Sequence, residues 1–337
     1  MKKIRVAVNG LGRIGRAFLK VARSKEEIEI VAVNDLGSIE NFAYLLKYDS
    51  VYGKSDFDVV VREGKLVVDG KETLFISEKE PLKLPWKNLN IDVVVESTGL
   101  FTSYEKAKVH IDAGARRVVI TAPAKDDEGG ETVLMGINEE KLGTCEISSN
   151  ASCTTNAGSP LLAILDEAVG IEKAILNTVH AYTASQALVD GPSKKDLREG
   201  RAAAQNIVPS STGAAIATTK AYPLLAGKFD GISIRVPVVA GSIVDITFIA
   251  KRDVTREEIN EILRGAAAAP RWQNIFSVTE EPLVSHDILG SHFASIADLE
   301  MTRVVDGNLV KVMAWYDNEM GYTHTLVGHV IKAGGLL

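Results

Sequence analysis

The pattern of apolar positions over the first 35 residues predicts a strand, a helix and a second strand. The run IRVAV at residues 4–8 is typical of a short buried strand, and EIVAVND at residues 29–35 is typical of another. Between them, the run AFLKVARS has helical spacing and follows three glycines, Gly10, Gly12 and Gly15. Because two parallel strands need a crossover connection, which is usually a helix, we expect a βαβ unit here.

Short apolar strands continue to about residue 150. Residues 58–76 alternate as antiparallel hairpins, with acidic-Gly turns at residues 63–64 and 69–70. Two further apolar runs end near Thr98 and at Thr121, and helical sequence separates them. Strands that alternate with helices predict a wound α/β sheet, so we expect an N-terminal Rossmann-type dinucleotide-binding domain.

The pattern changes after Asn150, which predicts a second domain of different construction. A helical stretch begins at residue 153, and a strand at residues 175–182 leads into a polar loop. Two long strands follow at residues 231–239 and 242–250. Such strands with few crossovers favour a mixed or antiparallel sheet, so we expect an α+β domain.

Two more helices are expected towards the C-terminus. Thr255 and Glu258 have the spacing of a capping box that opens the first of them. The second carries Val327, Val330 and Ile331 on one predicted apolar face.

Composition places the chain among ordinary globular proteins. Hydrophobic residues make up 46% and charged residues 24%, and no segment reaches the roughly 18 unbroken apolar residues of a membrane helix. The formal net charge is −6 and no basic block is present, so nucleic acid is not expected as a partner. Two cysteines are too few for a disulfide framework, and the chain starts in a strand pattern, so we expect a cytoplasmic protein.

The sequence GLGRIG at residues 10–15 matches G-x-G-x-x-G between a predicted strand and a predicted helix. In that setting Gly10 permits a tight turn, Gly12 lets a pyrophosphate approach the backbone and Gly15 allows close packing of helix on strand. Asp35 can accept hydrogen bonds from ribose hydroxyls and would repel a 2′-phosphate, which favours NAD over NADP. The alternative is an ordinary glycine turn.

Cys153 is the candidate nucleophile. It lies in SNASCTTN at the start of a predicted helix, where free N–H groups and the helix dipole would lower the pKa of the thiol. A lone cysteine is more often a buried structural residue, but small polar residues such as Ser152 and Thr154 surround this one. Cys145, in GTCEISS, is interpreted as a strand cysteine.

His180 is the candidate acid–base group. It ends the apolar strand ILNTV and precedes AYTASQ, a position typical of active-site residues. An imidazole near Cys153 could hold the thiolate as an ion pair and then move a proton of the reacting group. The alternative is a structural histidine. The other histidines lack metal-ligand spacing, so no metal site is predicted.

Nine sequence blocks occur in order from Val8 to Tyr322: VNGLGRIGR, NDL, LLKYDS, ESTG, SNASCTTN, HAYTASQ, RAAAQNIVPSSTGAA, IRVP and AWYDNEMGY. Together they resemble phosphorylating glyceraldehyde-3-phosphate dehydrogenase. We therefore predict an NAD-binding Rossmann domain at residues 1–152 and 317–337, with the C-terminal helix packed back onto it. Residues 153–316 are predicted to form the catalytic domain.

The resemblance implies an oxidation of glyceraldehyde 3-phosphate to 1,3-bisphosphoglycerate that serves glycolysis and gluconeogenesis. Cys153 would attack the aldehyde, and His180 would take the hydroxyl proton as hydride leaves for NAD. Inorganic phosphate would then attack the resulting thioester. The backbone N–H of Cys153 and the His180 ring would stabilise the oxyanion.

The resemblance also assigns binding residues. Thr183 and Arg235 would hold the substrate phosphate. The attacking phosphate would contact four residues: Ser152, Thr154, Thr212 and Gly213. The cofactor would contact Arg13 and Ile14 at its pyrophosphate, Asp35 at the adenine ribose, Thr98, Gly99 and Phe101 on the adenosine side, Thr121 near the nicotinamide ribose and Asn318 at the carboxamide. Apart from the resemblance, Arg198, Arg201, Lys194 and Lys195 would add local positive charge, although a solvated loop is the ordinary explanation of the two lysines.

Two features concern assembly and cofactor choice. Gly191 and Pro192 resemble NAD-using members in which this segment lies beside the adenosine of a neighbouring subunit, which implies a homotetramer. Gly37 and Ser38 stand where many NAD-specific members carry Thr-Asp. A smaller residue there leaves room for a 2′-phosphate, so use of NADP stays open.

Two other functions stay open from the sequence. Erythrose-4-phosphate dehydrogenase is a relative with the same nucleophile, but it typically lacks the STG block that contains Thr212 and Gly213. A non-catalytic nucleotide-binding or moonlighting protein on the same scaffold would not need Cys153 and His180, and no basic-aromatic face for RNA is apparent.

Overall fold

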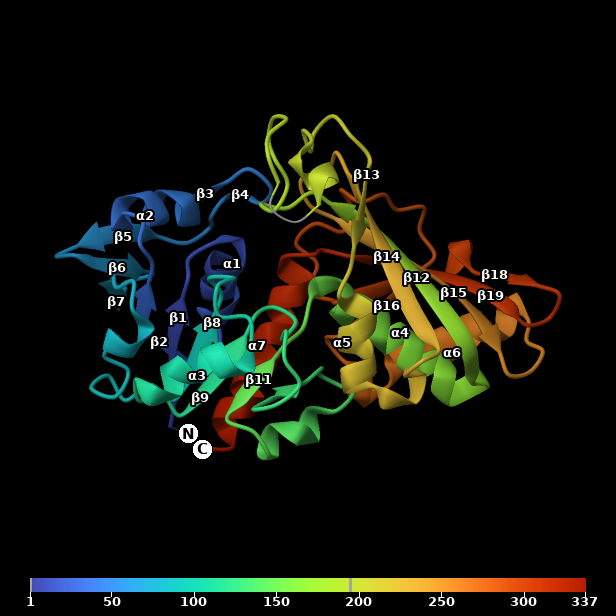
Figure 1. Ribbon diagram of the computed structural model, residues 1–337, viewed down its shortest axis with the longest axis horizontal. Helices are drawn as coiled ribbons and strands as arrows, with labels where there is room; N and C mark the ends of the chain where they lie inside the picture. The colour runs from blue at the N-terminus through green and yellow to red at the C-terminus, as the bar shows by residue number, and fades with distance from the viewer. Residues whose placement is uncertain (1, 194–195) are drawn as a thin grey trace. The chain divides into compact units, whose positions relative to one another are not determined.

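The computed structural model describes residues 2–193 and 196–337 (Figure 1). Lys194 and Lys195 lie outside the described residues. The chain divides into two compact units, one formed by Met1–Ala151 with Thr323–Leu337 and the other by Ser152–Tyr322. The boundary predicted at residue 317 differs from that of the compact units, because the second unit extends to Tyr322.

The first unit is built on a sheet in the order β10-β11-β9-β8-β1-β2-β7-β6-β5. Its strands are β1 (Ile4–Asn9), β2 (Ile28–Asn34), β5 (Val59–Arg62), β6 (Lys65–Val68), β7 (Lys71–Ile76), β8 (Val93–Glu96), β9 (Arg117–Ile120), β10 (Glu131–Thr132) and β11 (Ile147–Ser149), with β3 (Tyr48–Asp49) and β4 (Gly53–Lys54) as a separate pair. Its helices are α1 (Arg13–Ala22), α2 (Ile39–Lys47) and α3 (Tyr104–Asp112), with short 3₁₀ turns η1 (Pro81–Lys83) and η2 (Glu139–Gly143).

The parallel strands create a switch point between β1 and β8. The chain winds from β1 to β2 and β7 on one side, then returns to β8 and continues to β9 and β11 on the other. In open α/β sheets, ligands bind where the strand order reverses, beyond the carboxyl ends of the strands. The expected Rossmann-type architecture is confirmed, and the loops after β1 and β8 lie at this switch point.

The predicted hairpins close the far edge of this sheet. β5, β6 and β7 pair antiparallel, and the turns between them place Glu63, Gly64, Asp69 and Gly70 at positive φ. Positive φ at both central residues is the type I′ arrangement, whose twist matches that of the flanking strands.

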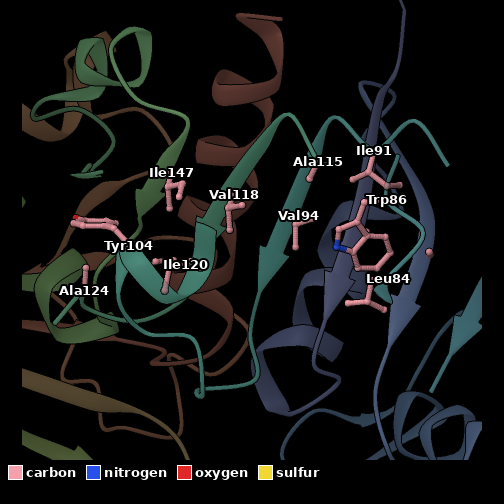
Figure 2. Packing of buried hydrophobic residues seen from close by; sticks show 13 residues of the cluster. Leu84, Trp86, Ile91, Val94, Tyr104, Ala115, Val118, Ile120, Ala124 and Ile147 are labelled. Atoms are coloured by element: carbon pink, nitrogen blue, oxygen red, sulfur yellow. The ribbon is translucent and has the colours of Figure 1, made fainter. Parts of the chain in front are cut away.

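A buried cluster packs beneath α3 (Figure 2). Val94 of β8 and Val118 of β9 belong to it together with Tyr104 of α3, and Trp86 enters from the segment before β8. Trp86 is fully buried. Full burial of an apolar side chain contributes roughly 1.5–3 kcal/mol to the stability of the fold. This cluster therefore holds α3 against β8 and β9.

The second unit is built on a mixed sheet in the order β13-β14-β12-β15-β19-β17-β16. Its strands are β12 (Ile171–Ala181), β13 (Val208–Ser211), β14 (Phe229–Val236), β15 (Ser242–Ala250), β16 (Phe276–Thr279), β17 (Ser295–Asp298), β18 (Arg303–Val305) and β19 (Leu309–Tyr316). β12 pairs parallel with β14 and antiparallel with β15, which confirms the mixed sheet.

Helices α4 (Cys153–Val169), α5 (Ala214–Ala221) and α6 (Arg256–Ala268) pack on that sheet. α4 contacts both other helices, so the three lie on one face. The short 3₁₀ turns of this unit are η3 (Leu197–Gly200), η4 (Pro223–Leu225), η5 (Pro270–Trp272) and η6 (Leu299–Met301). Helix α7 (Met320–Gly335) begins in this unit and continues into the first. In the described residues, no helix has both the length and the apolar character needed to cross a bilayer.

Two local predictions need correction. Cys145 does not lie on a strand, because β11 begins only at Ile147 and the Cys145 sulfur contacts the carbonyl oxygen of Lys141 at 3.5 Å. At the start of α6, Thr255 caps the helix by accepting from the N–H of Glu258 at 3.1 Å. The Glu258 carboxylate, which a full capping box would turn back to Thr255, pairs with Arg252 at 2.6 Å.

Candidate active site

Cys153 is the first residue of α4. Ser152 caps this helix, because its hydroxyl oxygen accepts from the N–H of Thr155 at 3.1 Å. The thiol therefore lies beside the N–H groups that begin the helix, where the dipole favours negative charge. Part of Cys153 stays exposed, so a ligand can reach it.

His180 lies near the end of β12 with its Nε2 atom 3.3 Å from the Cys153 sulfur. Its Nδ1 atom is 2.6 Å from the carbonyl oxygen of Ala181. A carbonyl oxygen only accepts, so Nδ1 carries the proton of the neutral ring. Nε2 is then an acceptor that faces the thiol.

Burial decides the protonation of this pair. It raises the pKa of the Cys153 thiol, against the guanidinium of Arg235 and the backbone N–H of Thr154, which lower it. Burial also lowers the pKa of His180 to about 3, and Arg235 acts in the same direction. The expected lowering of the thiol pKa is therefore wrong, because loss of hydration outweighs the helix N-terminus.

The directions of these pKa shifts define what the pair can do. Charging Cys153 or His180 alone is costly because burial removes much of the hydration of the charged form. Moving the thiol proton to Nε2 creates both charges together, with no change in net charge, at a separation of 3.3 Å. The arrangement is that of a nucleophile with its general base.

Arg235 is the cation beside the pair. The parallel register of β12 and β14 places Arg235 opposite His180, and its Nη1 atom donates to the carbonyl oxygen of Ala181 at 3.4 Å. Its buried Nε atom has no hydrogen-bond partner among the described residues. The Arg235 guanidinium therefore has a buried N–H group that can still donate a hydrogen bond, and its planar arrangement of donors suits the oxygens of a phosphate or carboxylate.

A network of buried hydroxyl groups, which was not predicted from the sequence, adjoins Cys153 and His180. The buried Tyr316 hydroxyl lies 3.0 Å from the hydroxyl of Thr154 and 2.8 Å from that of Thr178. Its ring meets His180 edge-on at 5.9 Å between centroids. Thr154, predicted to hold phosphate, therefore directs its hydroxyl to Tyr316. The only sequence signal was the placement of Tyr316 at the end of an apolar strand.

The other predicted anion-binding residues lie on two loops. After β12, the N–H of Thr183 donates to Gln186 at 2.8 Å. After β13, the Thr212 hydroxyl accepts from Ala214 at 3.1 Å, and Gly213 caps α5. β13 pairs antiparallel with β14, with Val208 opposite Arg235 and its last residue, Ser211, opposite Ile232. Ser211 therefore lies about 10 Å along the strands from Arg235, and Thr212 and Gly213 follow Ser211.

Asn318 is held by its carbonyl oxygen. Oδ1 accepts from the N–H of Gly241 at 3.0 Å and from the hydroxyl of Ser242 at 3.2 Å. Two donors on Oδ1 fix the amide, so its NH₂ group is the half that can donate to a ligand. Within the described residues, no group of three or more His, Cys, Asp or Glu could hold a metal ion.

The glycine loop of the first unit has the geometry of a dinucleotide cradle. A Cβ atom on Gly15 would lie 2.0 Å from the carbonyl oxygen of Gly10, so only glycine allows α1 to approach β1 this closely. A Cβ atom on Gly12 would meet no atom within 4 Å and would occupy open space at the start of α1. A pyrophosphate fits there, on a helix N-terminus.

Asp35 and Arg13 flank this loop. Asp35 directly follows β2, and its carboxylate accepts from the N–H of Leu11 at 2.7 Å and from that of Gly37 at 3.1 Å. Arg13 turns its guanidinium to Asp49 at 2.8 Å. Ile14 follows within α1.

The remaining predicted cofactor residues follow β8 and β9. Thr98 and Gly99 form a turn after β8, with Gly99 at φ +74°. The Phe101 ring lies edge-on to His110 with 5.9 Å between centroids. Thr121 directly follows β9 and donates its N–H to the carbonyl oxygen of Glu96 at 3.0 Å. All four lie at the carboxyl ends of parallel strands.

Comparison with known proteins agrees with this geometry. Residues 4–104 match the family model "Glyceraldehyde 3-phosphate dehydrogenase, NAD binding domain", and residues 152–318 match "Glyceraldehyde 3-phosphate dehydrogenase, C-terminal domain". The chain is 45% identical to glyceraldehyde-3-phosphate dehydrogenase 2 of Streptomyces avermitilis, over 99% of both chains. The chain belongs to the glyceraldehyde-3-phosphate dehydrogenase family. The glyceraldehyde-3-phosphate dehydrogenases of Clostridium acetobutylicum (47%) and Geobacillus stearothermophilus (46%) also match over 96% of both chains.

Family membership fits the division of the site residues. The NAD-binding match contains the glycine loop, Asp35 and the turn after β8, and the C-terminal match contains Cys153, His180 and Arg235. The glyceraldehyde-3-phosphate dehydrogenase family thus accounts for a nucleotide cradle in one unit and a thiol–imidazole pair in the other.

Proposed function

We propose that this chain oxidises glyceraldehyde 3-phosphate with NAD and inorganic phosphate to give 1,3-bisphosphoglycerate. The observation that carries the proposal is the Cys153 sulfur 3.3 Å from the acceptor nitrogen of His180, with Arg235 in register beside it. A nucleophile, its base and an anion-binding cation are the groups that acyl transfer from a phosphorylated aldehyde to phosphate requires.

The first steps use Cys153 and His180. The His180 Nε2 atom accepts the thiol proton as the sulfur attacks the aldehyde carbon, then returns it to the oxygen to give a thiohemiacetal. The backbone N–H of Cys153 and the protonated ring donate to the oxyanion on the way. His180 then removes the hydroxyl proton, while bound NAD supplies the hydride acceptor.

The later steps pass through a thioester on Cys153. A phosphate oxygen attacks the thioester carbon, the carbon–sulfur bond breaks and Cys153 leaves as the thiolate. We propose that Arg235 and Thr183 hold the substrate phosphate and that Ser152, Thr154, Thr212 and Gly213 hold the attacking phosphate. The distance along the strands between Arg235 and the end of β13, which Thr212 follows, supports two distinct anion sites. Thr154 would contribute its backbone N–H, because its hydroxyl faces Tyr316.

For the cofactor, we propose the pyrophosphate at the start of α1 near Gly12, Arg13 and Ile14, and the adenine ribose at Asp35. Thr98, Gly99 and Phe101 would contact the adenosine, Thr121 the nicotinamide ribose and Asn318 the carboxamide. The open space at Gly12 and the oriented amide of Asn318 support these assignments.

Assembly and location are also proposals. A homotetramer is supported by exposed apolar residues around the loop that follows β12, where Leu188 and Leu197 are 84% and 85% exposed. Large exposed apolar groups often mark association surfaces. The lack of a disulfide framework supports a cytoplasmic location, since both cysteines are free.

The test follows NADH absorbance with glyceraldehyde 3-phosphate or erythrose 4-phosphate, each with and without inorganic phosphate. We expect turnover with the triose that depends on phosphate and is at least about tenfold more efficient than with the tetrose, a difference of about 1.4 kcal/mol. Preference for erythrose 4-phosphate, or turnover independent of phosphate, would contradict the proposal.

Replacing Asp35 with alanine is expected to weaken NAD more than NADP. The substitution removes carboxylate hydrogen bonds to the ribose, worth about 1.5–3 kcal/mol, and relieves repulsion of a 2′-phosphate. The dissociation constant for NAD should rise about 10- to 150-fold. Isothermal titration with both cofactors measures this, with Asp35→Asn as the variant that keeps an acceptor. A larger loss for NADP would reject the role.

A further inference from the structure

A buried row of polar side chains lies across the carboxyl ends of β2, β1 and β8. Asn34, Asn9 and Glu96 are register partners on these strands, and all three are at least 94% buried. Asn34 donates to Asn9 at 2.7 Å, and Asn9 donates to Glu96 at 2.6 Å. Buried polar groups cost free energy unless they are hydrogen-bonded, and a fully paired network is rigid, so these three side chains hold one another in fixed orientations.

The Glu96 carboxylate ends the row and accepts from four donors. Its Oε2 atom accepts from Asn9 and from the His110 Nε2 atom at 2.9 Å. Its Oε1 atom accepts from the N–H of Thr98 at 2.9 Å and from the Thr98 hydroxyl. Four donors on two oxygens occupy the acceptor positions of this carboxylate and fix its orientation.

His110 is locked as a donor by Trp86. The indole Nε1 atom lies 3.2 Å from the His110 Nδ1 atom, and an indole N–H only donates. His110 therefore accepts at Nδ1 and carries its proton on Nε2, towards Glu96. Both rings are fully buried, and Trp86 is fixed in the apolar cluster of Figure 2.

Glu96 in turn shapes the turn that follows β8. Because the Thr98 hydroxyl gives its proton to Glu96, its oxygen accepts from the N–H of Leu100 at 3.1 Å. This turn also packs on the glycine loop: a Cβ atom on Gly10 would lie 2.7 Å from the Thr98 nitrogen. One carboxylate thus fixes the backbone on the β8 side of the switch point.

We propose that Glu96, oriented by His110 and Trp86, is a positioning residue for NAD that sets the shape of the Thr98–Gly99 turn. The proposal rests on the assignment of that turn to the adenosine side of the cofactor under the proposed function. Glu96 is buried beneath the turn and touches no reacting group. Its loss should therefore weaken cofactor binding and leave the chemical step unchanged.

Glu96→Gln tests this with an almost unchanged shape. Whichever way the new amide turns, its NH₂ group faces two donors, either those of Thr98 or those of Asn9 and His110. We expect the dissociation constant for NAD to rise about tenfold or more, as for loss of charged hydrogen bonds, with kcat at saturating NAD within about twofold of the wild type. ADP-ribose, which carries the adenosine half without nicotinamide, should lose affinity by the same factor.

A matched pair at position 110 gives a second readout. His110→Phe removes the donor to Glu96 and should follow Glu96→Gln, whereas His110→Gln keeps an N–H donor and should bind NAD within about threefold of the wild type. Thermal unfolding of each variant accompanies the titrations. If Glu96→Gln does not fold, the comparison of the two His110 variants decides.

The outcomes separate this inference from the proposed function. Folded variants with lower unfolding temperatures but unchanged affinity for NAD and ADP-ribose would show a purely structural role and overturn the inference. A fall in kcat at unchanged affinity would overturn it too. A wild-type chain that binds no NAD would instead contradict the proposed function.

Discussion

Replacing Cys153 with serine is expected to reduce oxidation of glyceraldehyde 3-phosphate by about 10⁴-fold or more, as loss of a covalent nucleophile does in other enzymes. A serine hydroxyl has a far higher pKa than a thiol and is a weaker nucleophile at neutral pH, so transfer of its proton to His180 is much less favourable than transfer from Cys153. Steady-state NADH production measures the loss. Affinity for NAD should stay within about threefold of the wild type, because the cradle lies in the other unit.

The chain supplies a matched control in its other cysteine. Cys145 lies between η2 and β11 in the first unit, and burial raises the pKa of its thiol. The Cys145→Ser variant should keep wild-type turnover. It should still be inactivated by thiol reagents, because Cys153 remains available to react with them. Near wild-type turnover in Cys153→Ser, or a comparable loss in Cys145→Ser, would show that the nucleophile has been misassigned.

Much of the fold could be predicted because its signals are local. Alternating apolar runs gave the strands, and acidic-Gly pairs gave the turns of β5, β6 and β7. The GLGRIG motif between a strand and a helix predicted the glycine loop. The prediction was possible because this loop needs glycine for steric reasons that involve only a few neighbouring residues. Cys145 was misplaced because the start of β11 depends on pairing with β9, which is far away in sequence.

The site was less predictable because it depends on register between distant strands. The sequence placed Cys153 at a helix start and His180 near a strand end, but the 3.3 Å between them depends on how α4 packs on β12. The position of Arg235 beside His180 depends on pairing between strands about 50 residues apart. The thiol pKa was misjudged because burial is a property of the folded unit.

The same reasoning explains which supporting groups were missed. Tyr316 reaches Thr154 and Thr178 across the second unit, and His110 reaches Glu96 across the first. Each is a polar side chain in an otherwise apolar or helical pattern, where sequence alone favours a structural role. Only the contacts show that both networks adjoin residues for which ligand binding is proposed.

Replacing His180 with asparagine is expected to lower turnover by about 10²- to 10⁴-fold, the usual contribution of a general acid–base group. It should also slow alkylation of Cys153 by iodoacetamide at pH 7 by about tenfold or more, since the thiolate is the reacting form. Without Nε2 as acceptor, the thiol must lose its proton to water from a site where burial raises its pKa. The alkylation rate of the variant should therefore keep rising with pH beyond the ordinary range of a cysteine, and we expect the wild type, in which Nε2 can accept the thiol proton, to react at lower pH than the variant.

The alkylation profile separates the base from a merely structural histidine. His286→Asn changes an exposed histidine of the same unit and should leave both turnover and the pH profile unchanged. If His180→Asn alkylated at the wild-type rate across the pH range while turnover fell, the imidazole would act only after the sulfur has attacked. If both rates stayed at wild-type values in folded protein, the 3.3 Å contact would have no part in the reaction.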